Sequence, residues 1–404
     1  MKPTGVNMTN VKQINRSCVL QLLLTKGAMS RTDLANSLQL TTATLTSICN
    51  DFIQKGLLIQ SGKADDQNIG RKRMPLEINY HYKYVVAINI HYNGSTVAIT
   101  DLSGDPVAVQ SVSMENSSSS DPKTFLARIA SICIRLLWEN NLPSDSVLGA
   151  CVCIVGSVNH IDGISLHPFK IFNDKSVYIK DILEKHFLFP VCVENNVCSF
   201  LNAEHIFGSS QEVTNLMVVK WGPGVGSATS TGGVVCKGPD YHSAEIGHTF
   251  FYQNSDMICK CGRKGCLESG VNLASFIEKI TELQKRSAVI QNAIKRYGIP
   301  DINNILYFLE IDCPELKKFT HACIHDLAIG VNNAIQVFSP DKVVLFGTLF
   351  ETKTTLKPFI ETILEINPYV TEDLFEESTL ADKKEYIGPA ATAIKNFLIE
   401  PGGE

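Results

Sequence analysis

The spacing of apolar residues changes abruptly near residue 80, and this change constrains the fold more than any other feature. Before residue 80, apolar side chains recur at intervals of three and four, which is typical of helices that bury one face. Beyond it, short apolar runs at 84–90, 94–104 and 148–155 alternate with helical segments such as 122–139. That alternation is typical of an α/β fold. We therefore predict a small helical domain followed by an α/β body in two lobes.

The first 56 residues predict three helices, with a tight turn between the second and the third. Ser30 and Asp33 have the spacing of a capping box at the start of the second helix, and Thr41 is positioned to cap the third. Two apolar segments, 57–60 and 74–78, flank a polar loop and are predicted to be strands. Three helices followed by a strand, a loop and a strand are the plan of a winged helix-turn-helix, which binds DNA.

Residues suited to contact DNA gather in this region. Residues 1–80 carry ten Lys/Arg against five Asp/Glu, a balance of +5, although the whole chain is at −5. Small hydroxyl side chains allow a helix to enter the major groove closely, and arginines can contact phosphates or a narrow minor groove. The candidates are Arg31, Thr41, Thr42, Ala43, Thr44, Thr46 and Ser47, with Arg71, Lys72 and Arg73 at the end of the polar loop. The alternatives are a solvated, Thr-rich helix face and a solvated run of charge.

Cysteine usage and hydropathy bear on the compartment. The chain has 13 cysteines, an odd number, and most lie singly in apolar segments, as reduced thiols do in a cytoplasmic protein. No apolar run reaches the ~18 residues that cross a bilayer, and the N-terminus lacks the pattern of a signal peptide. We expect a cytoplasmic protein that is not in a membrane.

The strongest local motif is His248 followed by Cys259, Cys261 and Cys266, with glycines inside the cysteine loop. Three thiolates and one imidazole satisfy tetrahedral Zn²⁺ and leave no open position. We therefore predict a structural zinc site. The alternative is a disulfide with core thiols, which a reducing compartment disfavours.

The sequence around this motif resembles the ROK family of repressors, open reading frames and sugar kinases. The resemblance rests on Glu245-Ile246-Gly247-His248, the cysteine loop running to Glu268, 193–197, 222–226 and 388–391. It implies an actin-like, RNase H-type body, similar to sugar kinases, whose cleft binds a sugar. Ile14-Asn15-Arg16-Ser17 and the predicted winged helix resemble the repressor branch of the family.

The family's kinases differ from this chain at two steps of the reaction. Their catalytic base is the Asp of an Asn-Asp pair, where this chain has Asn195-Asn196, and an amide accepts no proton at neutral pH. Their first phosphate loop resembles Asp-x-Gly-Gly-Thr, where this chain has the segment 89–93 with no carboxylate. We predict a sugar sensor and not an enzyme. Two alternatives stay open: an active sugar kinase that uses another base such as Glu194, and a DNA-binding or scaffold protein without a ligand.

The resemblance places Asn195, Asn196, Glu245, His248 and Glu268 at the family's sugar-contacting positions. His248 could then join the metal and the sugar through its two ring nitrogens. The glycine loop 222–226 is a weaker signal, since a strand-to-strand turn needs glycine without any nucleotide.

The domain organisation follows from these assignments. We expect a DNA-binding domain and linker at 1–80, a first lobe at 81–204 with the C-terminal helix 388–404, and a second lobe at 205–387 that contains the zinc knuckle. In the second lobe we predict a strand at 216–220 that pairs with 232–235. The expected partners are a double-stranded DNA operator, a sugar or sugar derivative, and further copies of the chain in a homodimer or a dimer of dimers.

Overall fold

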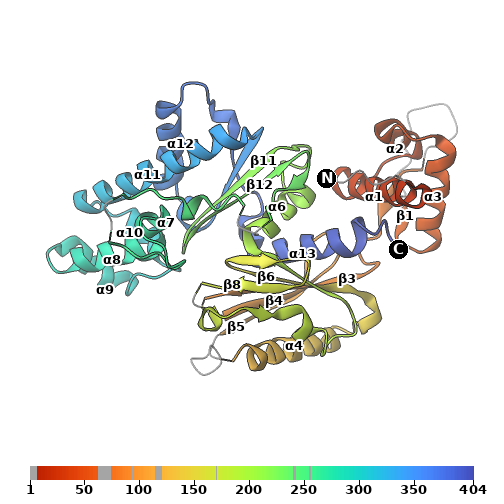
Figure 1. Cartoon of the computed structure of the whole chain (residues 1–404), viewed down its shortest axis with the longest axis horizontal. Helices are drawn as coiled ribbons and strands as arrows, with labels where there is room; N and C mark the ends of the chain where they lie inside the picture. Colours follow the sequence, from red (N-terminus) through yellow and green to blue (C-terminus); the bar gives the residue numbers. More distant parts are fainter. Residues whose placement is uncertain are drawn as a thin grey trace. The chain divides into compact units, whose positions relative to one another are not determined.

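The computed structural model describes residues 7–61, 74–92, 94–113, 121–169, 171–239, 243–253 and 256–404. The chain forms two compact units, one from Met1–Gln211 with Lys383–Glu404 and one from Glu212–Asp382. Each unit holds its own five-stranded sheet (Figure 1). Each also has its own cluster of buried apolar residues. Within the described residues, no helix combines the length with the apolar character that a bilayer span requires.

The first unit begins with the predicted three helices and two strands. Ser30 Oγ accepts from the backbone N–H of Asp33 at 3.2 Å, and Thr41 Oγ1 accepts from that of Thr44 at 3.2 Å, so both predicted caps are confirmed. The two strands pair antiparallel. The elements are α1 (Met8–Lys26), α2 (Arg31–Leu38), α3 (Thr42–Gln54), β1 (Leu58–Gln60) and β2 (Leu76–Ile78).

A five-stranded sheet in the order β10-β6-β3-β4-β5 forms the rest of this unit. The strands β3, β6 and β10 run parallel, while β4 and β5 are antiparallel to their neighbours. Helix α4 covers one face, and α13 packs on the other against β3, β6 and α6 (Figure 1). The bounds are β3 (Tyr84–His91), β4 (Gly94–Thr100), β5 (Pro106–Ser113), α4 (Pro122–Glu139), β6 (Val147–Ile154), β10 (Val191–Asn195), α6 (Asn196–Phe207) and α13 (Ile387–Ile394), which continues as a π-helix, η7 (Lys395–Ile399).

A small antiparallel sheet follows β6. It contains β7 (Ser157–Asn159), β8 (Ile164–His167) and β9 (Val177–Tyr178), and leads into α5 (Ile179–Leu183).

The second unit has a sheet in the order β13-β12-β11-β14-β15. The predicted pairing of 216–220 with 232–235 is wrong, because β12 lies between them and pairs with both β11 and β13. The glycine loop 222–226 is the tight turn that sends the chain back as β12. The bounds are β11 (Leu216–Trp221), β12 (Val225–Thr231), β13 (Val234–Val235), α7 (Glu268–Val271), α8 (Leu273–Gln284), α9 (Ala288–Tyr297), α10 (Ile305–Leu309), α11 (Pro314–Phe338), β14 (Lys342–Phe346), α12 (Lys353–Ile366) and β15 (Phe375–Glu377).

Candidate functional site

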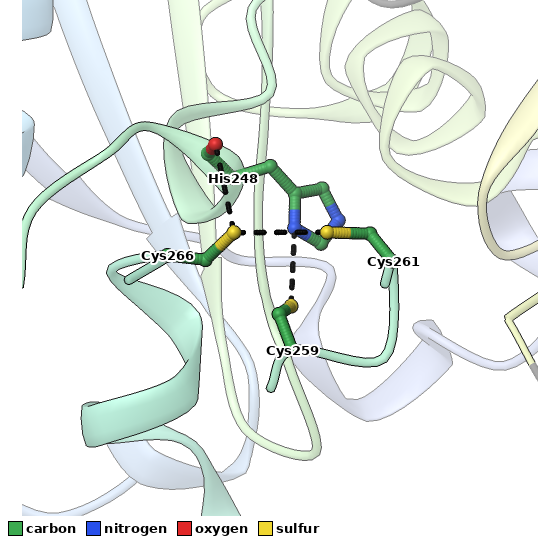
Figure 2. Close-up of side chains that lie close together, drawn as sticks. All are labelled: His248, Cys259, Cys261 and Cys266. Atoms are coloured by element: carbon green, nitrogen blue, oxygen red, sulfur yellow. Dashed lines mark hydrogen bonds between the residues drawn. The ribbon is translucent and has the colours of Figure 1, made fainter. Parts of the chain in front are cut away.

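The predicted metal ligands come together in the second unit. The ligand atoms of His248, Cys259, Cys261 and Cys266 all lie within 4.8 Å of one another, and three of the four residues are buried. Figure 2 shows the sulfur atoms gathered beside one nitrogen of the imidazole ring. Two short bridges, Phe250 with Cys266 and Ile258 with Lys264, fold the loop that carries the three cysteines.

The distances within this cluster match a tetrahedral site. Cys261 Sγ lies 3.6 Å from Cys266 Sγ, and Cys259 Sγ lies 3.5 Å from His248 Nδ1. Bonds of about 2.3 Å to sulfur and about 2.0 Å to nitrogen give tetrahedral edges of roughly 3.8 and 3.5 Å. The donor set and its geometry therefore fit a metal ion. All 13 cysteines are free thiols, so the disulfide alternative finds no support.

Arg263 supplies positive charge beside the cluster. Its Nε donates to Cys261 Sγ at 3.5 Å. Burial is the largest single effect on the pKa of the Cys261 thiol and raises it, but the hydrogen bonds from Arg263, Cys259 and Cys266 together outweigh burial and lower that pKa. Burial raises the pKa of Cys259. Three thiolates around a divalent ion leave a net negative charge, which this guanidinium offsets.

Glu268 connects the cysteine loop to the glycine loop. Its side chain is buried, and Oε2 accepts from the backbone N–H of Val225 at 2.9 Å. A Cβ at Gly224 would lie 2.6 Å from the same oxygen, so glycine is needed there for this close approach. The sequence motif identified Glu268 as a sugar-contacting candidate but gave no sign of this structural contact. Glu245 is half-buried and precedes the 3-10 turn Ile246–His248.

Asn195 and Asn196 lie in the first unit, where β10 passes into α6. Asn195 caps the helix: its Oδ1 accepts from the N–H groups of Val197 and Cys198 at 2.8 and 3.1 Å, and its Nδ2 donates to Gly156 O at 2.8 Å. Asn196 is the first residue of α6 and is half-buried. The structure thus holds the Asn195 side chain in one orientation at the positive end of a helix.

The segment compared with the kinase phosphate loop ends at the same edge of this sheet. Ile90 and Asn195 both pair with Ile154, at the carboxyl ends of three parallel strands. Ligands of α/β proteins bind at such edges. Asn89 donates through Nδ2 to Glu385 Oε2 at 3.3 Å, a contact that the sequence did not predict because 296 positions separate the two residues. Asn93 lies outside the described residues.

The five sugar candidates are thus divided between the two units. Asn195 and Asn196 belong to the first unit, and Glu245, His248 and Glu268 belong to the second.

The DNA candidates on α3 face outward. Thr41, Thr42, Ala43, Thr44 and Ser47 are exposed, and Thr46 is half-exposed. Arg31 is half-buried and donates through Nη2 to Asn50 Oδ1 at 2.9 Å, which joins α2 to α3. Arg71, Lys72 and Arg73 lie outside the described residues.

The chain matches a family model described as the ROK family over residues 85–396. The match begins after β2 and covers the second unit and the larger part of the first.

Similar proteins extend over the helical region as well. The chain is 22% identical over 403 residues to a protein named xylose repressor from Caldicellulosiruptor bescii, covering 98% of this chain and 99% of that one. It is 24% identical over 362 residues to the DNA-binding transcriptional dual regulator NagC of Escherichia coli, covering 89% and 86%. The alignments therefore include residues before position 85 as well as the body.

Solved structures share the fold. A ROK family transcriptional regulator, a homologue of the E. coli MLC protein, has a TM-score of 0.79 at 22% identity and covers 97% of each chain. A ROK family glucokinase from Streptomyces griseus, in complex with glucose and AMPPNP, has a TM-score of 0.64 at 17% identity and covers 77% of this chain and 99% of its own. The body therefore has the fold shared by ROK regulators and ROK sugar kinases.

Proposed function

The chain belongs to the ROK family, and on this premise we propose that it is a sugar-responsive transcriptional repressor that binds operator DNA. The observation that carries the proposal is the exposed face of α3, with its small hydroxyl side chains at the capped start of the helix. Such a face suits close approach to base edges and phosphates in the major groove. Similarity to named repressors over almost the whole chain supports the same reading.

Residues 1–80 act in this proposal as a winged helix-turn-helix and linker. Helix α3 enters the major groove, and β1 and β2 are the strands of the wing. Arg71, Lys72 and Arg73 in the wing contact phosphates or the minor groove, and Thr41, Thr42, Ala43, Thr44, Thr46 and Ser47 provide the groove contacts. Arg31 contacts phosphate only after it leaves Asn50.

The body acts as a sensor. We assign the lobes 81–204 with 388–404 and 205–387 to sugar binding, through Asn195, Asn196, Glu245, His248 and Glu268. Amide and carboxylate groups both form hydrogen bonds with sugar hydroxyls. An amide at 196 cannot accept the proton that phosphoryl transfer requires, so the sugar is bound and not phosphorylated.

The Cys/His cluster holds structural Zn²⁺ in this account. With Nδ1 of His248 facing Cys259, Nε2 is the ring atom that we assign to the sugar. Bound zinc would therefore fix the orientation of a sugar-binding imidazole. The ion supplies structural stability and no step of chemistry.

Sugar binding alters operator affinity because it favours one state of the protein over another. We place the repressor in the cytoplasm, as a homodimer or a dimer of dimers on a pseudo-palindromic operator.

A gel-shift assay tests this function. The purified chain is incubated with DNA from upstream of its own coding sequence, with D-xylose, N-acetyl-D-glucosamine or D-glucose, and without ATP. We expect a retarded complex whose dissociation constant is changed by one sugar. Absence of a complex on any upstream fragment, or the same affinity with every pentose, hexose and N-acetyl sugar, would contradict the proposal.

An active sugar kinase is the second candidate. It needs a base other than Asn196, and Glu194 is the nearest carboxylate in sequence. That side chain is buried, and its Oε1 accepts from the backbone N–H of Asn195 at 2.9 Å, which engages one of the two carboxylate oxygens. Release of ADP that depends on both ATP and sugar would revive this candidate.

A further inference from the structure

The end of the chain lies against the DNA-binding helices. We call residues 400–404 the tail (Figure 1 marks the C-terminus beside β1). Side chains of α1 and the residue that follows α3 donate to main-chain carbonyls of the tail. These bonds are Gln13 Nε2 to Glu400 O at 2.8 Å, Arg16 Nε to Gly402 O at 2.6 Å, Arg16 Nη2 to Gly403 O at 3.4 Å, Ser17 Oγ to Glu400 O at 3.3 Å and Lys55 Nζ to Gly403 O at 3.1 Å.

Arg16 is the centre of this contact. The residue is only 2% exposed, its Nη1 lies 2.6 Å from Asp51 Oδ2 on α3, and its guanidinium lies 4.5 Å from the ring centroid of Phe52. A buried guanidinium is costly unless its donors are satisfied. The tail supplies two carbonyl acceptors and α3 supplies the carboxylate. One cation therefore joins α1, α3 and the tail.

Two glycines make the close contact possible. Gly402 and Gly403 have φ values of +72° and +71°. A Cβ at Gly403 would lie 2.8 Å from Phe52 Cε1, and one at Gly402 would lie 3.0 Å from Arg16 Cβ. Any other residue at 403 would be strained and would also collide with the core of the helical region. The tail is thus shaped to fit this position.

The segment that leads into the tail is bonded to α6. Ser199 Oγ lies 2.9 Å from Thr392 Oγ1, Asn202 Nδ2 donates to the same oxygen at 3.1 Å, and Lys395 Nζ donates to Asn202 Oδ1 at 3.0 Å. A Cβ at Gly388 would lie 3.1 Å from Ser199 Oγ, so the two helices cross closely. Helix α6 and the segment 387–399 therefore move as one body.

The same α6 begins at the proposed sugar residues. The Asn195 side chain fixes the first turn of α6 and also holds Gly156 O after β6. A ligand that forms hydrogen bonds with Asn195 or Asn196 therefore contacts the first turn of this helix. A continuous path of packed and hydrogen-bonded elements then leads from α6 through 387–399 and the tail to Arg16, Asp51 and α3.

We propose that residues 387–404 couple sugar binding at the start of α6 to the position of α3, with Arg16 as the positioning residue. The inference rests on the proposed function and specifies how it is regulated. Coupling of this kind needs an element that both sites bias. Residues 387–404 meet this requirement, because Thr392 and Lys395 are bonded to α6 and the tail is bonded to the DNA-binding helices.

The test compares lesions of the tail contact with matched controls in the full-length protein. Gly403→Val expels the tail, while Gly232→Val imposes a similar backbone cost at a φ of +58° with no atom within 4 Å of the new Cβ. Arg16→Met removes the central cation, while Lys12→Met removes a charge from an exposed position on the same helix. Arg16→Lys keeps the charge but loses the fork of donors.

The main readout is the ratio of operator dissociation constants with and without sugar, using D-xylose, N-acetyl-D-glucosamine and D-glucose as probes. We expect a ratio of about tenfold or more for the wild type and both controls, within the usual range of allosteric coupling. Gly403→Val and Arg16→Met should reduce this ratio to less than about twofold. Their affinity for the sugar should stay within about twofold of the wild-type value. Arg16→Lys should lie between these values.

Hydrogen exchange provides a readout that needs no sugar. In Gly403→Val we expect faster exchange of α1 and α3 and unchanged exchange of β3 and β6. If this variant loses DNA binding altogether, faster exchange of α3 alone still supports the positioning role. Unchanged exchange of α3 overturns it.

The outcomes separate the two claims. If the wild type binds no upstream DNA or responds to no sugar, the proposed function fails and the coupling fails with it. If the wild type responds and Gly403→Val and Arg16→Met respond equally well, the coupling is wrong and the proposed function stands.

Discussion

The Cys/His cluster and the start of α6 differ in how well each site tolerates a change of residue type. The cluster has four side chains of the types a metal needs, with ligand atoms within 4.8 Å of one another. The start of α6 has two amides where phosphoryl transfer would need a carboxylate. A structural metal site depends on every ligand, whereas either Asn or Asp can form hydrogen bonds with a hydroxyl. In the proposed function, sugar binding therefore tolerates an amide at a position where phosphoryl transfer needs a carboxylate.

The largest expected effect is on the cluster. Cys261→Ser should remove stoichiometric zinc and lower the unfolding free energy by about 4 kcal/mol or more, since metal binding contributes directly to folding. Elemental analysis and calorimetry measure the two quantities, and the sugar response should weaken as well. Cys236→Ser is the control, because Cys236 is a half-buried thiol outside the cluster. Full zinc content and sugar response in Cys261→Ser would refute the metal assignment.

The second effect is a loss of stability at low pH, caused by the buried His205 in α6. Burial, with a smaller contribution from Lys395, lowers the pKa of His205 to about 4. The unfolded chain, with a histidine pKa near 6.5, therefore binds the proton more readily, and stability should fall as pH drops from about 6.5 to about 4. The difference between these two pKa values corresponds to roughly 3 kcal/mol of unfolding free energy. Denaturant unfolding of wild type and His205→Gln over this range checks it, and parallel pH profiles for the two proteins would contradict it.

The third effect separates binding from catalysis at Asn196. Asn196→Ala should weaken sugar binding by about 1–2 kcal/mol, because hydroxyl hydrogen bonds are lost. Asn196→Asp should keep that affinity, since a carboxylate accepts from hydroxyls and suits the first turn of a helix. Titration calorimetry with the responsive sugar compares the two. Equal affinity for Asn196→Ala and the wild type would remove Asn196 from the sugar site.

The smallest effect is at Glu268, which joins the glycine loop to the cluster. Glu268→Gln replaces a charged acceptor of the Val225 N–H with a neutral one. We expect the unfolding free energy, measured by denaturant unfolding, to fall by about 1 kcal/mol. Zinc content should not change, because Glu268 is not among the four clustered ligands. Loss of zinc from this variant would show that the carboxylate takes part in metal binding.

The features predicted well from the sequence are those set by neighbouring residues. Ser30 and Thr41 cap the helices that follow them, and Cys259, Cys261 and Cys266 lie within eight positions, so short-range geometry brings them together. The motif also predicts His248 as the fourth ligand, and Nδ1 of this residue lies 3.5 Å from Cys259 Sγ.

The features that the sequence did not reveal join residues far apart. Arg16 meets Gly402 across 386 positions, and Asn89 meets Glu385 across 296. The spacing of apolar residues does not predict such a contact, because the contact depends on how whole helices and strands pack together. The predicted pairing of 232–235 with 216–220 is wrong for a related reason. Val225–Thr231 mixes polar and apolar residues, so its sequence does not indicate the strand β12 that it forms.

The central claim is that this chain reports sugar occupancy to DNA without phosphorylating the sugar. The most direct measurement is fluorescence anisotropy of labelled upstream DNA during titration with each sugar of the panel, with no ATP present. The account predicts tight binding of the DNA and a change in affinity of about tenfold with one sugar. A response that appears only when ATP is added, together with consumption of ATP, would contradict it.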